Sequence, residues 1–144
     1  MAEPFYFEDV EVGNELPSIE KPAITKVQLL QYAGASHDYN LLHTDDAFAR
    51  SAGMPNGVIG HGMLSMAFAS QLLTDWAGLA NVRKVDVRFT APTEPGDVVT
   101  AGGKVLKKYR DGGENRVECE IWTRTHKGIV TTKGTGVVAL PTKK

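Results

Sequence analysis

A chain of 144 residues is long enough to bury a hydrophobic core, and we expect one domain over residues 1–144. Its 42% apolar and 23% charged residues are typical of an ordinary globular protein. The formal net charge of −1 argues against a nucleic-acid partner, and no apolar run reaches the length of a membrane span.

The first 22 residues are rich in proline, glycine and acidic side chains, which predicts irregular backbone with one short strand. Met1–Pro4 lacks the basic region and the apolar core of a secretory signal. The only cysteine, Cys119, has no second cysteine with which to form an internal disulfide. Together these features favour a cytoplasmic location.

A capping pattern predicts that a helix begins after Thr25. The Thr25 hydroxyl can accept a hydrogen bond from the first turn, and Gln28, three residues later, can reach back to it. Val27, Leu30 and Gly34 lie on one face of the helix that follows. We expect the helix to end at Gly34, because glycine often terminates helices.

Residues 36–60 lack a steady hydrophobic period, and several glycines and prolines predict irregular backbone. Residues 45–52 have the composition of one or two short helical turns. A loop of this length is usually functional or disordered. Apolar residues along it favour an ordered loop that folds onto the body of the domain: Leu41, Leu42, Phe48 and Ile59.

Residues 61–76 predict a helix that is apolar on nearly every side and therefore buried all round. Strands follow it, because apolar and polar residues alternate over residues 84–89 and 117–124. Turn residues at 111–113 and 127–128 predict hairpins, and Gly102-Gly103 predicts a bulge or a sharp bend. One buried helix and an antiparallel meander make an α+β fold, in which a curved sheet wraps around the helix.

Two short segments carry the chemistry. Asp38 and His43 place an acid and a base on one loop, with Asn40 between them. Such a pair can hold one water molecule between two groups that exchange protons. His61-Gly62-Met63 begins the apolar helix, where a free backbone N–H can stabilise a developing oxyanion. Together they suggest proton transfer beside a carbonyl group.

The two segments resemble the MaoC-like hydratases, the group of (R)-specific enoyl-CoA hydratases and dehydratases. Its usual pattern is close to G-D-x-N-P-[LIV]-H followed by H-G-M, and this chain has H-D-Y-N-L-L-H from His37 and an intact H-G-M from His61. His37 stands where a small or acidic residue is commoner, and Leu41 replaces the proline. The resemblance covers about residues 5–140. It implies a hotdog fold whose subunits pair edge to edge, with an acyl pocket lined by both.

Hydration of an enoyl thioester is the reaction that this resemblance implies, and these residues can carry it. Asp38 polarises or deprotonates the water, and His43 helps to bind it and shuttles the proton of the α-carbon; which of them is the base in each direction stays open. The Gly62 N–H stabilises the thioester oxyanion. By resemblance, Asn40 helps to shape the site and Ser70 hydrogen-bonds to Asp38. His61 is expected to be structural.

Other functions stay open alongside this one. A thioesterase on the same fold also activates water beside a thioester, and a non-catalytic subunit could bind acyl thioesters or support a partner chain. We expect no cofactor apart from coenzyme A within the substrate, and a homodimer or a multiple of it. The identity of the acyl group stays open, and so does the choice between coenzyme A and a carrier protein as the thiol. One group of possible metal ligands consists of His37, Asp38, His43 and Asp45. Its spacing matches no zinc site, so we expect no metal.

Overall fold

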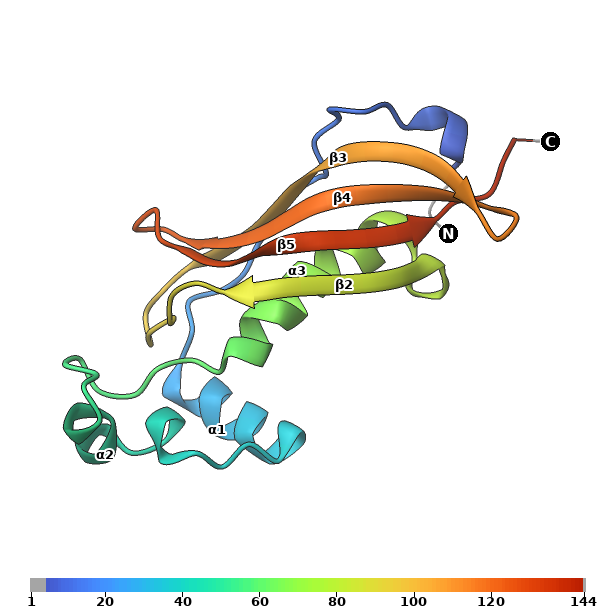
Figure 1. The fold of residues 1–144 in the computed structure, drawn as a ribbon. Helices are drawn as coiled ribbons and strands as arrows, with labels where there is room; N and C mark the ends of the chain where they lie inside the picture. Colours follow the sequence, from blue (N-terminus) through green and yellow to red (C-terminus); the bar gives the residue numbers. More distant parts are fainter. Residues whose placement is uncertain (1–4, 144) are drawn as a thin grey trace.

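A curved, five-stranded antiparallel sheet packs against one long helix (Figure 1). The computed structural model describes residues 5–143, and the strand order in the sheet is β1-β3-β4-β5-β2. The strands are β1 Ile19–Glu20, β2 Val82–Phe89, β3 Val99–Asp111, β4 Glu114–Thr125 and β5 Val130–Ala139. The α-helices are α1 Lys26–Ser36, α2 Asp46–Ser51 and α3 Gly62–Ala77, with 3-10 turns η1 Phe7–Asp9, η2 Leu41–His43 and η3 Leu79–Asn81.

This arrangement confirms the predicted α+β class and the hotdog fold. Residues of β4 alternate as expected: Val117, Cys119 and Ile121 are fully buried, and the residues between them are partly exposed. Both predicted hairpin turns are present, with left-handed backbone at Gly112 (φ 57°) and Gly128 (φ 83°). In the described part of the chain, no helix is long and apolar enough to cross a membrane.

The prediction of a bulge at Gly102-Gly103 is wrong. Both residues keep a regular register with β4, and the irregularity lies further along β3, between Val105 and Lys107. A side chain at Gly102 would collide with the ring of Trp122. Glycine is therefore needed at position 102 because the ring of Trp122 lies across the strand.

Helix α1 begins as predicted and ends later than predicted. The Thr25 hydroxyl accepts a hydrogen bond from the backbone N–H of Gln28 at 3.0 Å. The helix runs through Gly34 and ends at Ser36, because the left-handed residue that terminates it is His37, with φ 58°. Its buried residues are Leu29 and Ala33, whereas the face that carries Val27 and Leu30 is exposed.

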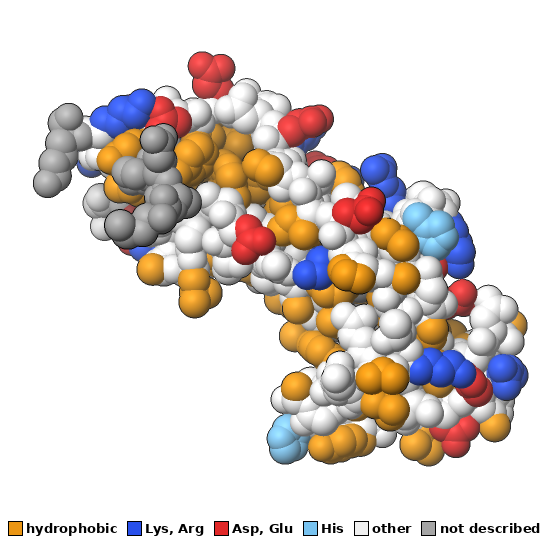
Figure 2. Space-filling model, turned by 180° about the vertical axis from the view of Figure 1, so that it is seen from behind, with side chains coloured by type: hydrophobic (Ala, Val, Ile, Leu, Met, Phe, Trp, Pro, Cys, Tyr) orange, Lys and Arg blue, Asp and Glu red, His pale blue; other side chains and the backbone are white. Residues whose placement is uncertain are grey.

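The expectation that α3 is buried all round is also wrong for the single chain. Leu64, Phe68, Leu72 and other residues of one face pack against the sheet, but Met63 on the opposite face is 52% exposed. The sheet and α3 form the larger part of the molecule, and α1 and α2 form a smaller part. Seen from behind, the surface is indented between these two parts, and apolar side chains lie beside the indentation (Figure 2).

The loop over residues 36–60 is ordered, as predicted, and contains η2 and α2. Asp45 caps α2, since its carboxylate accepts a hydrogen bond from the Phe48 N–H at 3.0 Å. The loop and α1 lie beyond the N-terminal end of α3 (Figure 1). Backbone contacts such as the one from the Ile59 N–H to the Leu42 carbonyl (3.0 Å) hold the two halves of the loop together.

Candidate active site

The loop brings Asp38 and His43 together. Their carboxylate Oδ2 and ring Nε2 are 3.6 Å apart, which is too long for a direct hydrogen bond. A water molecule can contact both atoms at this separation. The Asp38 carboxylate is half exposed and the His43 ring is largely buried, so the pair lies where the protein meets solvent.

Local hydrogen bonds shape this loop. The Asn40 N–H donates to the Asp38 carboxylate at 3.3 Å, and the Asn40 side-chain oxygen accepts from the Leu42 N–H at 3.0 Å. Asn40 therefore caps η2 with its side chain and fixes the approach to His43.

The tautomer of His43 follows from its other nitrogen. Nδ1 lies 2.8 Å from the backbone carbonyl of Ile59, and a carbonyl can only accept, so Nδ1 carries the proton. In the neutral ring, the lone pair of Nε2 then faces the Asp38 carboxylate. This is the orientation that a proton-accepting imidazole needs.

His61 forms a layer beneath the pair. Its ring stacks on His43 with centroids 3.8 Å apart, and its Nε2–H donates to the Asp38 backbone carbonyl at 3.3 Å. The side chain is 1% exposed, and burial lowers its pKa, so His61 is neutral at pH 7. The sequence predicted only a structural residue here. The position of His61 within the H-G-M motif was the signal in the sequence that could have indicated its contacts with Asp38 and His43.

We predict that His61 is a positioning residue. His61→Phe keeps a ring against His43 but loses the hydrogen bond to Asp38, and turnover should fall about tenfold, as expected for one lost hydrogen bond. His61→Gln keeps a donor and loses the stack. Kinetics should show a lower kcat in both, with little change in KM; unchanged kcat in both folded variants would contradict the role.

The same residue predicts a pH effect on stability. Because the fold lowers the pKa of His61 below its usual 6.5, the unfolded chain binds a proton that the folded chain excludes as the pH falls below that value. The free energy of unfolding should therefore decline on acidification, and this part of the decline should vanish in His61→Phe. Urea titrations of both proteins from pH 7.5 to pH 5 test it; parallel curves would contradict it.

The backbone N–H of Gly62 opens α3 and has no partner within the helix. Beside it, the ring of Phe89 from the end of β2 covers the Gly62 α-carbon: a methyl group built there would lie 2.9 Å from the ring. Phe89 itself is 49% exposed. The approach to this N–H therefore runs past an aromatic side chain that sequence reasoning did not single out.

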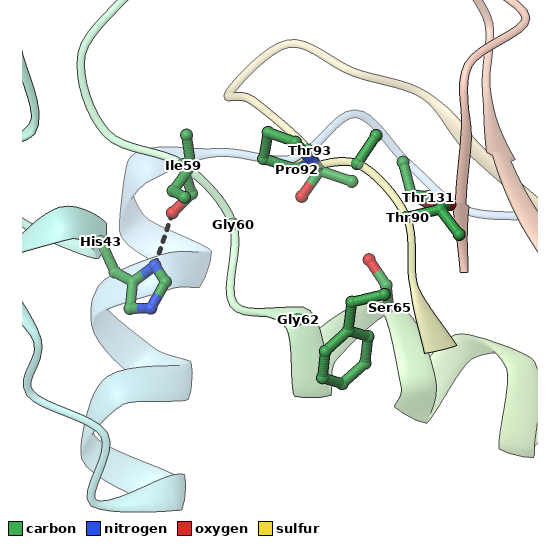
Figure 3. A pocket seen from close by; sticks show the side chains of 11 residues that line it. His43, Ile59, Gly60, Gly62, Ser65, Thr90, Pro92, Thr93 and Thr131 are labelled. Atoms are coloured by element: carbon green, nitrogen blue, oxygen red, sulfur yellow. Dashed lines mark hydrogen bonds between the residues drawn. The ribbon is translucent and has the colours of Figure 1, made fainter. Parts of the chain in front are cut away.

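A cavity of about 340 Å³ joins His43 to the start of α3 (Figure 3). Most of its wall comes from the segment before α3, the first turn of α3, and the chain from the end of β2 onward, and His43 and Thr131 complete it. Its lining residues are His43, Ile59, Gly60, Gly62, Ser65, Phe89, Thr90, Ala91, Pro92, Thr93 and Thr131.

Within the part of the chain that the structure describes, three further residues from the sequence analysis make no side-chain hydrogen bond to the pair. The Ser70 hydroxyl donates to the Met66 carbonyl of its own helix at 2.8 Å, and within residues 5–143 it makes no hydrogen bond to Asp38. His37 is exposed, with its ring edge toward Tyr39. Burial raises the pKa of the Cys119 thiol to about 12, which leaves it unreactive as a nucleophile.

The groups that could hold a metal ion differ from the cluster considered in the sequence. Ligand atoms of Asp38, His43 and His61 lie within 4.8 Å of one another, while Asp45 caps α2. However, the two rings are stacked 25° from parallel, so their in-plane lone pairs do not converge on one point. His61 Nε2 already donates to a carbonyl. The geometry suits proton transfer better than a tetrahedral metal site.

The model of the MaoC like domain family matches residues 9–135. The chain belongs to this family. Among solved structures, the R-hydratase PhaJ1 of Pseudomonas aeruginosa is 26% identical, with a TM-score of 0.82 over 96% of this chain and 86% of that one. The (R)-hydratase of A. caviae, involved in PHA biosynthesis, is 29% identical, with a TM-score of 0.82 over 93% of this chain and 99% of that one.

Curated relatives are longer proteins. The MaoC protein of Klebsiella aerogenes is 28% identical over 76% of this chain, which spans 34% of its length. Fatty acid synthase subunit beta of Aspergillus oryzae is 32% identical over 72% of this chain, which spans 6% of its length. The chain thus matches one segment of each of these larger proteins.

Proposed function

We propose that the protein is a hydro-lyase that reversibly hydrates trans-2-enoyl thioesters, with coenzyme A as the thiol, to (R)-3-hydroxyacyl thioesters. The observation that carries the proposal is the Asp38–His43 pair, 3.6 Å apart, beside a cavity that reaches the free N–H of Gly62. Two similar structures are (R)-hydratases, which supports the assignment.

The groups suffice for a balanced reaction without a further cofactor. Asp38 and His43 hold one water molecule, and one of them takes its proton as the oxygen bonds to C3 of the enoyl group. The C2=C3 electron pair moves toward the thioester, whose oxygen becomes negative next to the Gly62 N–H. C2 then takes a proton from the pair, and the product is the 3-hydroxyacyl thioester. Dehydration is the reverse path.

An assay with crotonyl-CoA and a longer enoyl-CoA separates this function from the alternatives. Hydration removes the enoyl absorbance without releasing thiol, and chiral analysis should give the (R) product. A thioesterase would release free thiol, and a non-catalytic acyl-thioester-binding subunit would do neither. Thiol release without hydration would overturn the proposal.

We further propose that the active species is a homodimer or a multiple of it. Within residues 5–143, strand β2 pairs only with β5, so its outer edge is open, and open edges tend to be covered. Near the end of this strand, Phe89 and Met63 are about half exposed apolar side chains. Light scattering of active protein should give at least twice 15.6 kDa. An active species of monomer mass would contradict pairing, and an inactive monomer would point to a second, different chain.

A further inference from the structure

Ser65, a largely buried residue of α3, has a hydroxyl without the carbonyl partner that the other serine and threonine hydroxyls of the three α-helices have. Across helices α1 to α3, four serine or threonine hydroxyls donate to carbonyls of their own helix: Ser36, Ser51, Ser70 and Thr74. Ser65 is 4% exposed, yet within residues 5–143 its hydroxyl makes no hydrogen bond. The Ser65 oxygen is not one of the fully enclosed side-chain atoms that lack a partner among the described residues, so water or a ligand in the cavity can reach it.

The Ser65 hydroxyl faces the cavity beside His43 and Gly62. Ser65 lines this cavity, and Figure 3 shows its oxygen directed toward the space between α3 and the segment after β2. It lies three residues after Gly62, about one helical turn, and helical side chains lean toward the N-terminus. Because Gly62 has no side chain, an oxygen atom at the helix start can approach both the Gly62 N–H and the Ser65 hydroxyl.

A second cavity hydroxyl, that of Thr93, has a different setting. It packs directly against Gly60, where an added side chain would collide with it, and the Thr93 carbonyl accepts from the Gly60 N–H at 2.8 Å. Thr93 therefore holds the segment that leads to α3. Ser65 is the hydroxyl at the helix start itself.

We propose that Ser65 is a substrate-contacting residue, whose hydroxyl donates a second hydrogen bond to the thioester oxygen beside the Gly62 N–H. This inference rests on the proposed function. As the water oxygen bonds to C3, the C2=C3 electron pair moves onto the thioester oxygen, which becomes a better acceptor. The Ser65 proton stays on its oxygen throughout. The bond therefore strengthens in the transition state and should act mainly on kcat.

The test compares Ser65→Ala with Thr74→Val, which removes a hydroxyl that is bonded within α3. With crotonyl-CoA, Ser65→Ala should lower kcat by on the order of 10²-fold, because one oxyanion donor is lost. Its melting temperature should stay close to that of the wild type, since alanine suits a helix. Thr74→Val should keep wild-type kcat. Hydration by folded Ser65→Ala within twofold of an active wild type would overturn the inference.

Ligand binding separates failure of this inference from failure of the proposed function. S-butyl-CoA is a thioether that lacks the thioester oxygen of butyryl-CoA. The wild type should bind butyryl-CoA more tightly, and Ser65→Ala should lose part of that preference, because the Gly62 N–H still donates, while binding S-butyl-CoA as before. If the wild type hydrates no enoyl-CoA but shows this binding preference, and Ser65→Ala reduces it, the hydratase assignment is wrong and the Ser65 contact is still supported. Equal binding of the two ligands by the wild type would overturn the contact.

Discussion

Asp38→Asn and His43→Ala should each lower hydration of crotonyl-CoA by about 10²–10⁴-fold, the usual contribution of a general acid–base group. Asparagine keeps the size of Asp38 and its contact with the Asn40 N–H but cannot accept a proton from water. Alanine at position 43 removes the ring that lies 3.6 Å from the carboxylate. Steady-state kinetics on the purified variants measure the loss.

The controls must separate chemistry from folding. Asp75→Asn removes an exposed carboxylate of α3 and should leave hydration unchanged. Because His43 stacks on His61 and bonds to the Ile59 carbonyl, His43→Gln gives a second variant with a polar side chain in the same space. Thermal unfolding confirms that each protein is folded. Near-normal turnover by a folded Asp38→Asn would remove the role assigned to the pair.

Gly62→Ala should lower turnover, and Gly62→Val should lower it by on the order of 10²–10³-fold, as expected when an oxyanion donor becomes unusable. Helix propensity favours alanine over glycine by about 1 kcal/mol, so propensity alone would make Gly62→Ala harmless. The structure adds an obstacle, because the new methyl group lies 2.9 Å from the Phe89 ring, which must shift. The new methyl group therefore competes for space with both the Phe89 ring and the substrate thioester.

The double variant Gly62→Ala/Phe89→Leu distinguishes the two effects. Removing the ring should restore any melting temperature that Gly62→Ala loses. It should leave turnover low if the methyl group also occupies the space of the thioester carbonyl. Phe89→Leu alone measures the separate effect of the ring. Full activity in folded Gly62→Val would show that the substrate does not approach this helix start.

The features predicted correctly from sequence are those that neighbouring residues determine. Alternation in β4, the Thr25 cap, the two hairpin turns and the start of α3 each depend on residues a few positions apart. The spacing from Asp38 to His43 places both on one short loop. These local patterns predicted the α+β class and a testable acid–base pair, and the resemblance of the two motifs to a known family implied the hotdog fold.

Errors arose at two glycines, where the residue type alone does not decide the local structure. Gly34 has helical backbone because the termination falls on His37, and Gly102 faces Trp122 across the sheet instead of marking a bulge. Neither outcome is visible in a window of neighbouring residues. A glycine in the sequence indicates only that a side chain does not fit at that position. Whether a backbone turn or a neighbouring strand excludes the side chain depends on the surrounding structure.

By itself the sequence determined the fold class and the chemical groups, because hydrophobic periodicity and short motifs are encoded locally. Only the tertiary structure decided how those groups work together. The stack of His61 on His43, the Phe89 ring over Gly62 and the unpartnered Ser65 hydroxyl in the cavity join segments that the chain keeps apart. Such contacts depend on how the loop, α3 and β2 pack, and packing follows from the shape of the whole domain.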